Sequence, residues 1–274
     1  MASILLTLGL CSCRTSLPSS ASQPTSAPIE TTVDSSAAKE DALEPSVSEP
    51  SVSEPSVPEP SVPEPSAAEK AEAAQYRQLG LDYRGQGRLE DAIAVLENSV
   101  TLDPQNLSGQ VILGWTLHLA EQPEAAIDVL QQTLGQDEGH VPALNALGIV
   151  YLVDGQLEKA VDTHTKAVTL KSDNEIGYYN LSLAYHRLEE YKQAITNAQQ
   201  AAELEPGNPH PLVALAIAHW DNQDATAAQQ AYQQAINLDP AYQDAWFLEH
   251  LKQAGFSPDQ IQKTDDIRQS LYPI

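Results

Sequence analysis

The 274-residue chain has only two cysteines, Cys11 and Cys13, and both lie at its N-terminal end. The rest of the chain therefore has no disulfide, no thiolate metal site and no cysteine nucleophile. It also has no phosphate-binding loop, no G-x-S-x-G, no H-E-x-x-H and no dinucleotide fingerprint. The seven histidines do not have the spacing of a metal-ligand set. We therefore expect no enzyme activity, no metal, no cofactor and no small-molecule substrate.

Basic residues are scarce, with 14 Lys and Arg against 38 Asp and Glu, so the formal net charge is −24. A surface this acidic repels phosphate backbones, which argues against nucleic acid as a partner. The same charge keeps a protein soluble, and this simpler explanation accounts for most of it.

Long apolar runs are also missing. The N-terminal run from Ile4 to Leu10 is seven residues, which is too short to span a bilayer and is at the lower limit of a signal-peptide core. The L-C-S-C that follows it is similar to a bacterial lipoprotein box, with Cys13 as the residue that would be acylated. Residues 1–13 are accordingly interpreted as a signal and lipobox-like segment, which would begin further upstream if the true start codon does. The alternative is an unstructured apolar N-terminus that happens to contain cysteine.

Residues 14–69 are rich in Ser, Pro, Ala and Glu and repeat E-P-S-V about every five residues. Frequent proline blocks helices and sheets, and few large apolar side chains are present to form a core. This composition predicts a disordered spacer, with a P-x-x-P docking motif as the alternative. Strong helix formers replace it near Ala67.

Residues 73–242 divide without gaps into five units of 34 residues: 73–106, 107–140, 141–174, 175–208 and 209–242. Each unit has Leu at position 7 and Ala at position 20, and position 8 is always small. A self-similar 34-residue period predicts stacked pairs of helices. His164 is at position 24, where large apolar residues recur, so we expect it in the core.

This array resembles the tetratricopeptide repeat family, which also has an aromatic or large residue at position 11 and Pro at position 32. The resemblance implies an all-α, right-handed solenoid of helix-turn-helix repeats over residues 70–242. We expect the two helices of each unit at about positions 1–14 and 15–28. Residues 243–274 break the pattern and predict C-terminal capping helices. One of these ends at Gly255, and the next starts at the capping box Ser257–Gln260.

In the family, positions 2, 5, 9, 12 and 13 of the first helices line a concave groove that holds protein partners. The cations with which chaperone-binding relatives hold a terminal carboxylate are missing here. The groove is instead apolar and aromatic, with Trp115 and Trp220 as the expected anchors for an apolar peptide or amphipathic helix. The alternative is that the C-terminal helix itself occupies part of the groove, through the weak apolar stripe of Ile261, Ile267 and Leu271. The predicted partner-binding residues are Leu81, Val111, Trp115, Leu119, Asn145, Ile149, Leu152, Tyr179, Leu183, His186, Ile217 and Trp220.

Two hypotheses follow for the whole chain. The first is a non-enzymatic protein-interaction scaffold, lipid-anchored on the periplasmic side of a bacterial envelope membrane. It is similar to tetratricopeptide lipoproteins that assist assembly of envelope complexes. The alternative is a soluble cytoplasmic adaptor or co-chaperone-like protein.

Overall fold

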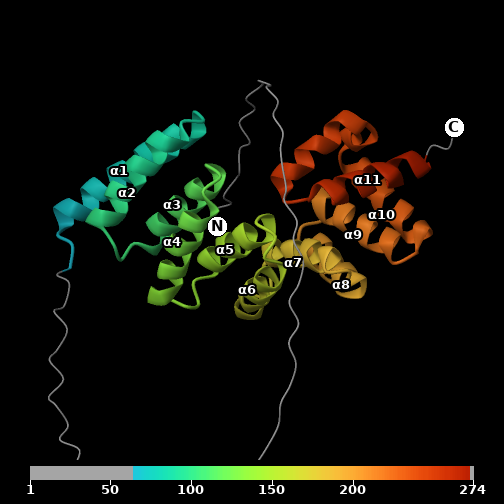
Figure 1. Cartoon of the computed structure of the whole chain (residues 1–274), viewed down its shortest axis with the longest axis horizontal. Coiled ribbons are helices and arrows are strands. Elements are labelled where there is room, and N and C mark those ends of the chain that lie inside the picture. Colours follow the sequence, from blue (N-terminus) through green and yellow to red (C-terminus); the bar gives the residue numbers. More distant parts are fainter. Residues whose placement is uncertain (1–63, 272–274) are drawn as a thin grey trace, which may run out of the picture. The chain divides into compact units, whose positions relative to one another are not determined.

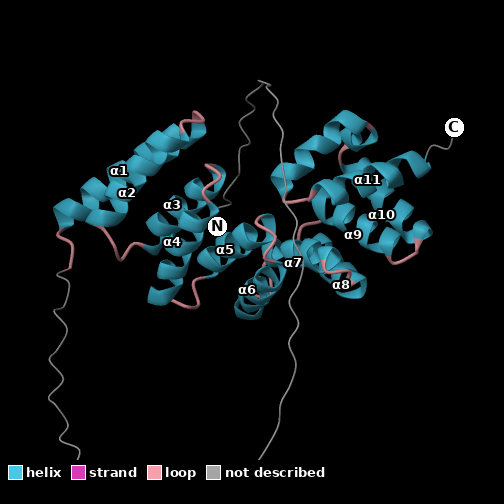
Figure 2. Cartoon of the chain, viewed as in Figure 1, coloured by secondary structure: helices cyan, strands magenta, loops and turns pink. Residues whose placement is uncertain are grey.

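The computed structural model describes residues 64–271. The lipobox-like segment, nearly all of the predicted spacer and residues 272–274 lie outside this range. Within it the chain is all-α, with eleven α-helices, two 3₁₀ helices and no strand (Figures 1 and 2).

The α-helices are α1 (Ala67–Gly85), α2 (Leu89–Leu102), α3 (Leu107–Leu119), α4 (Pro123–Gln136), α5 (Val141–Val153), α6 (Leu157–Leu170), α7 (Glu175–Arg187), α8 (Tyr191–Leu204), α9 (Pro209–Asp221), α10 (Ala225–Leu238) and α11 (Pro258–Leu271). The two 3₁₀ helices are η1 (Pro240–Gln243) and η2 (Ala245–Ala254). Helices α1 to α10 form five pairs, and each pair packs against the pair that follows it in the chain.

The starts of the first helices are determined by the last residue of the preceding unit. Asn106 and Asn174 each accept a hydrogen bond from the backbone N–H three residues later, at 2.9 and 3.3 Å. His140 does the same through Nδ1 at 3.3 Å, and Asn208 accepts from the second helical N–H at 3.0 Å. These caps satisfy N–H groups that have no partner inside the helix.

The second helices run from position 17 to position 30, two residues later than predicted. Position 15 has a positive φ in all five units, and it is occupied by Gly87, Glu121, Gly155, Glu189 and Gln223. A left-handed residue cannot continue an α-helix, so the first helix ends at position 13 and the second begins after the turn.

Positions 8 and 24 determine how closely the two helices of a unit approach each other. A Cβ on Gly80 or Gly114 would lie 2.6 or 2.7 Å from the Leu side chain at position 24 of the same unit. A Cβ on Gly148 would lie 2.5 Å from the ring of His164, which is fully buried as predicted. Burial lowers the pKa of His164 to about 3, so this histidine is neutral.

Position 7 shows how one unit covers the next. Leu113, Leu147 and Leu181 are 3–4 % exposed and Leu215 is partly exposed, and all four follow an earlier unit of the array. Leu79 is 38 % exposed, because no earlier repeat precedes it in the described residues. Each layer of a solenoid is therefore completed by its neighbour.

The C-terminal residues form an end of different construction. Gly255, with φ of 87°, ends η2, and Ser257 and Gln260 form the predicted capping box at the start of α11. The helix predicted over residues 243–254 is a 3₁₀ helix rather than an α-helix. Its buried residues Leu248 and Leu251 are three positions apart, and the 3₁₀ period of three residues places both on one side.

Candidate functional site

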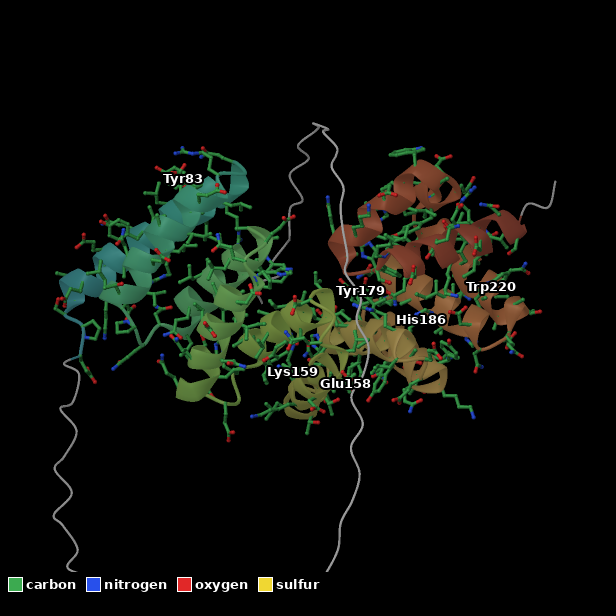
Figure 3. All side chains as sticks on the ribbon, viewed as in Figure 1. Tyr83, Glu158, Lys159, Tyr179, His186 and Trp220 are labelled. Carbon is green, nitrogen blue, oxygen red and sulfur yellow. The ribbon has the colours of Figure 1, made fainter. Side chains whose placement is uncertain are left out.

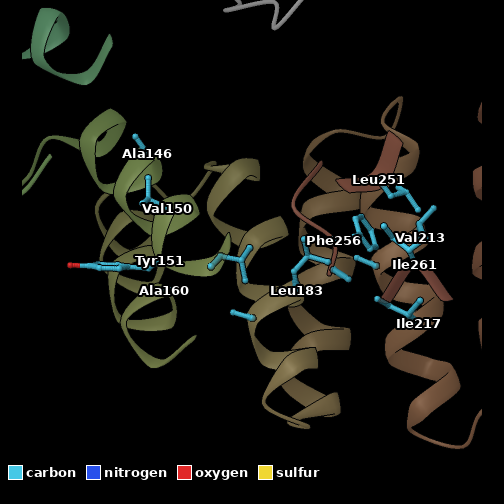
Figure 4. Packing of buried hydrophobic residues seen from close by; sticks show 14 of the residues in the cluster. Ala146, Val150, Tyr151, Ala160, Leu183, Val213, Ile217, Leu251, Phe256 and Ile261 are labelled. Atoms are coloured by element: carbon cyan, nitrogen blue, oxygen red, sulfur yellow. The ribbon is translucent and has the colours of Figure 1, made fainter. Parts of the chain in front are cut away.

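The groove positions on α7 and α9 are covered by residues 254–271, which we call the C-terminal strap. Tyr179 Oη donates a hydrogen bond to the Ala254 carbonyl at 2.5 Å. A Cβ on Gly255 would lie 3.6 Å from Leu183 and 3.8 Å from Leu152, so the strap backbone lies directly on these side chains. Figure 4 shows Phe256 and Ile261 of the strap beside Leu183, Val213 and Ile217.

A polar network fastens the strap to the groove. Gln260 Nε2 donates to the Leu183 carbonyl and lies 3.2 Å from His186 Nδ1. His186 Nε2 lies 3.1 Å from one oxygen of Asp221, and Lys263 Nζ donates to the other oxygen at 2.9 Å. These contacts fit a neutral imidazole that carries its proton on Nε2.

The pKa values of His186 and Lys263 are shifted in opposite directions within this network. It lowers the pKa of His186, although the Asp221 carboxylate acts in the opposite direction. The hydrogen bond to Asp221 raises the pKa of Lys263, so the ammonium stays charged. The strap is therefore held by one charged hydrogen bond as well as by apolar contacts.

Ten of the twelve predicted groove residues consequently divide into two sets, and Asn145 and Trp220 belong to neither. The covered face consists of residues that lie under or beside the strap, namely Leu152, Tyr179, Leu183, His186 and Ile217. Figure 3 shows Tyr179 and His186 in this part of the molecule, together with Trp220, which is half-buried. Asn145 forms a pair of side-chain amide hydrogen bonds with Asn174 at 2.9 and 3.0 Å.

The other predicted residues remain accessible. We define the free face as Leu81, Val111, Trp115, Leu119 and Ile149, together with Val153 at position 13 of the third repeat. Leu119 is 41 % exposed and Val153 is 52 % exposed, and the remaining four are partly exposed. The free face can bind apolar side chains. Nothing observed tests the predicted partner-binding role of either set, so that role stays a prediction.

The sequence analysis missed residues on both faces. Arg84 is at position 12 of the first repeat, the same repeat position as His186. It was not predicted because the predicted groove was apolar. Phe256 and Gln260 were not predicted to contact the groove, because no repeat periodicity extends to them. The last helix lies against α9, and Ile261 and Ile267 of its expected apolar stripe are buried.

The described residues form neither a metal-ion site nor a membrane-spanning helix. Over residues 64–271 no three His, Cys, Asp or Glu side chains are grouped so that they could hold a metal ion. None of the helices in this range is both long and apolar enough to cross a membrane. Cys13 lies outside the described residues, so its lipidation stays a prediction.

Comparison with protein families gives matches to two tetratricopeptide repeat models, one at residues 77–141 and 213–249 and the other at 176–208. The third repeat falls largely between the matches, but α5 and α6 have the same bounds within their unit as the other pairs.

Sequence comparison gives matches to parts of longer proteins, and two of these are chaperone-related by name. The Hsp70-Hsp90 organizing protein of Triticum aestivum is 31 % identical over 87 residues, which are 32 % of this chain and 15 % of that protein. The heat shock protein STI1 of Saccharomyces cerevisiae is 26 % identical over 114 residues, which are 41 % of this chain and 18 % of that protein. The chain thus spans less than a fifth of the length of these relatives.

Many solved structures share the fold, and PilF and MamA are two of them. PilF of Pseudomonas aeruginosa has a TM-score of 0.59 at 21 % identity and covers 75 % of this chain and 94 % of its own. MamA of Desulfovibrio magneticus has a TM-score of 0.56 at 21 % identity and covers 62 % of this chain and 96 % of its own. Together with the phased repeats and the stacked helix pairs, these matches show that the chain belongs to the tetratricopeptide repeat family.

Proposed function

We propose that this protein is a non-enzymatic scaffold that holds a protein partner on its free face, in the first three repeats. The observation that supports this is the accessible apolar column of α3 and α5, with Trp115 between Val111 and Leu119. Contiguous apolar surface on a protein usually marks a binding site. The described part of the chain covers the corresponding surface of the fourth and fifth repeats with its own strap and leaves this one open.

The test is capture of partners by the full-length protein in crosslinked cells, followed by mass spectrometry. Trp115→Asp places a charge in the middle of the free face, and we expect at least a tenfold loss of captured partner, because buried Trp residues dominate binding energy. Trp246→Asp is the matched control, since Trp246 is 73 % exposed on η2 and lies outside the groove. Equal capture by the two variants would place the partner elsewhere.

We further propose that the protein is anchored by acylation of Cys13 on the periplasmic side of a bacterial envelope membrane. Residues 14–63 would act as the spacer that lets the repeats reach a partner away from the lipid surface. Stable anchoring requires more than one acyl chain. Intact-mass analysis should therefore find a mature chain that begins at multiply acylated Cys13, and Cys13→Ser should release the protein from membranes.

A second candidate is a soluble cytoplasmic adaptor. The matches to proteins named Hsp70-Hsp90 organizing protein and STI1 favour it. Fractionation of cells separates the two candidates, because only the anchored protein sediments with membranes. An unmodified full-length chain in the soluble fraction would contradict the anchor and leave the scaffold function in place.

A further inference from the structure

The first helices of the repeats differ from ordinary surface helices in composition. Neither α3 nor α5 contains a single Asp, Glu, Lys or Arg, and α9 contains only Asp221. A helix that is apolar on all sides is normally buried on all sides. For α9 this holds, because the strap covers its groove side, where Val213 and Ile217 are fully buried. For α3, and for α5 apart from Leu152, which lies under the strap, the described residues supply no such cover.

Charged groups of both signs flank the free-face residues in the sequence. The carboxylates nearest in sequence to α3 and α5 are Glu121 and Asp154, which lie in the turns that follow these helices. The cation at the first repeat is Arg84, whose side chain has no hydrogen bond or ion pair within residues 64–271, and partial burial lowers its pKa. Arg77 differs, since it contacts Ser99 and Asp103 at 3.3 and 3.7 Å. Arg84 is therefore a partly desolvated cation without a carboxylate.

The strap shows which ligand chemistry these groove columns accept. It presents Ile261, Thr264 and Ile267 as a buried stripe at spacings of three residues. Asp259 in its first turn lies within electrostatic reach of Arg187, which donates to the Leu152 carbonyl at 2.5 Å. An amphipathic helix with a carboxylate near a groove arginine, and with Lys263 paired to the groove carboxylate of Asp221, is thus a ligand that this protein already binds on α7 and α9.

We propose that the free face receives an acidic amphipathic helix from another protein, with its apolar stripe over Trp115 and Leu119 and a carboxylate within reach of Arg84. This rests on the proposed scaffold function and specifies the partner. A second copy of this chain is disfavoured as the occupant, because the six residues of its free face are all apolar and it would bring a second Arg84 to the interface. Pairing of opposite charges at a partly desolvated site gives specificity to such an interface.

The experiment measures binding of two designed helical peptides to the full-length protein. Both have about 18 residues, or five helical turns, and the same Leu stripe, but one is flanked by Glu and the other by Lys. Measurement at about 0.15 M salt limits the effect of the net charge of −24, because the Debye length is then about 8 Å. We expect the acidic peptide to bind at least tenfold more tightly.

Two variants complete the test. Arg84→Glu should reverse the preference, and Arg84→Gln, which disturbs folding less, should remove most of it. Arg88→Gln is the matched control, because this arginine near the end of the same helix is paired with Asp91 at 2.6 Å and should not affect binding.

Each result has a distinct meaning. If both peptides bind equally, or the basic peptide binds more tightly, the proposed acidic partner is wrong while an apolar groove is retained. If neither peptide binds to the wild-type protein, the proposed function itself fails. If the acidic preference persists in Arg84→Gln, the charge is recognised elsewhere and the assignment to Arg84 is overturned.

Discussion

The covered face and the free face are built from the same kind of repeat, but only the covered face is occupied by another segment of the chain. On the covered face, Leu183 and Ile217 are fully buried and His186 belongs to a polar network with the strap. On the free face, Trp115 and Ile149, which are at the same repeat position as Leu183 and Ile217, remain partly exposed. The same helix register therefore gives a core surface at one end and an accessible surface at the other. The difference shows that burial in this array depends on what lies next to a repeat, as well as on the repeat itself.

The largest effect is expected from removing residues 243–274, which include η2 as well as the strap. Ending the chain after Tyr242 exposes Leu183, Val213 and Ile217, and burial of each such side chain contributes about 1.5–3 kcal/mol. We expect a loss of roughly 5 kcal/mol, which lowers the Tm by about 10–20 °C in a domain of this size. Thermal unfolding followed by circular dichroism measures it.

Deletion of residues 14–63 is the matched truncation, because it leaves Ser66, which caps α1, and all other described residues in place. This variant should melt within about 2 °C of the full-length chain, since changes away from packed surfaces have small effects. Similar melting of both truncated proteins would mean that the strap does not stabilise the covered face.

A smaller loss of stability is expected from substitutions in the core of the third repeat, beneath the free face. Gly148→Ala places a Cβ about 2.5 Å from the His164 ring and should cost about 1–3 kcal/mol through overpacking. Adding His164→Ala should recover part of this loss, because the fourth repeat combines Ser182 with Ala198 at the same two positions. Gly135→Ala, with nothing within 4 Å of the new Cβ, should be neutral or stabilising. Denaturant unfolding of the wild-type protein, these three variants and the single variant His164→Ala tests this, and strictly additive effects of Gly148→Ala and His164→Ala would contradict direct contact.

Acid should destabilise both faces through their buried histidines. Burial lowers the pKa of His164 to about 3, and burial together with His250 lowers that of His210, on α9, to about 4. Their folded-state pKa values lie below the unfolded value of about 6.5, so the unfolded chain binds more protons as the pH falls from 6.5 towards 4. Stability is therefore complete above pH 6.5 and decreases below it.

The variant His164→Leu isolates one of these groups, because Leu occupies the same position in the first two repeats. It should reduce the pH dependence by about 1 kcal/mol per pH unit between pH 6.5 and 4, the linkage expected for one proton. Tm measured across this range gives the slope. An unchanged slope would mean that His164 is not the group that titrates.

The smallest effect is expected from the ion pair that fastens the strap. Lys263 pairs with Asp221 at 2.9 Å, and Asp221 is only 12 % exposed, so Lys263→Gln should cost about 1 kcal/mol. Lys252 pairs with Glu249 at 2.7 Å, but both side chains are more than half exposed, so Lys252→Gln should change stability by less than about 0.5 kcal/mol. Equal losses of stability in the two variants would mean that the more buried ion pair is not the stronger one.

Much of the fold follows from local features of the sequence. The 34-residue period predicted the helix pairs. Gly148 and His164 pack against each other within one unit, and Ser257 with Gln260 forms the predicted cap of α11. These features depend on contacts between residues close in sequence, and such contacts repeat with the unit. The turn at position 15 was missed because Glu121 and Glu189 adopt a conformation that their residue type does not indicate.

The sequence by itself therefore determined the family, the helix order and the apolar character of the groove columns. Only the tertiary structure decided which part of the groove is accessible. The strap reaches Leu152 and Leu183 from about 70 to 100 residues away, through contacts outside the repeat period, so no sequence spacing predicts them. Whether an apolar side chain such as Ile217 is core or binding surface is a property of its neighbours in space, because burial depends on what excludes water from it.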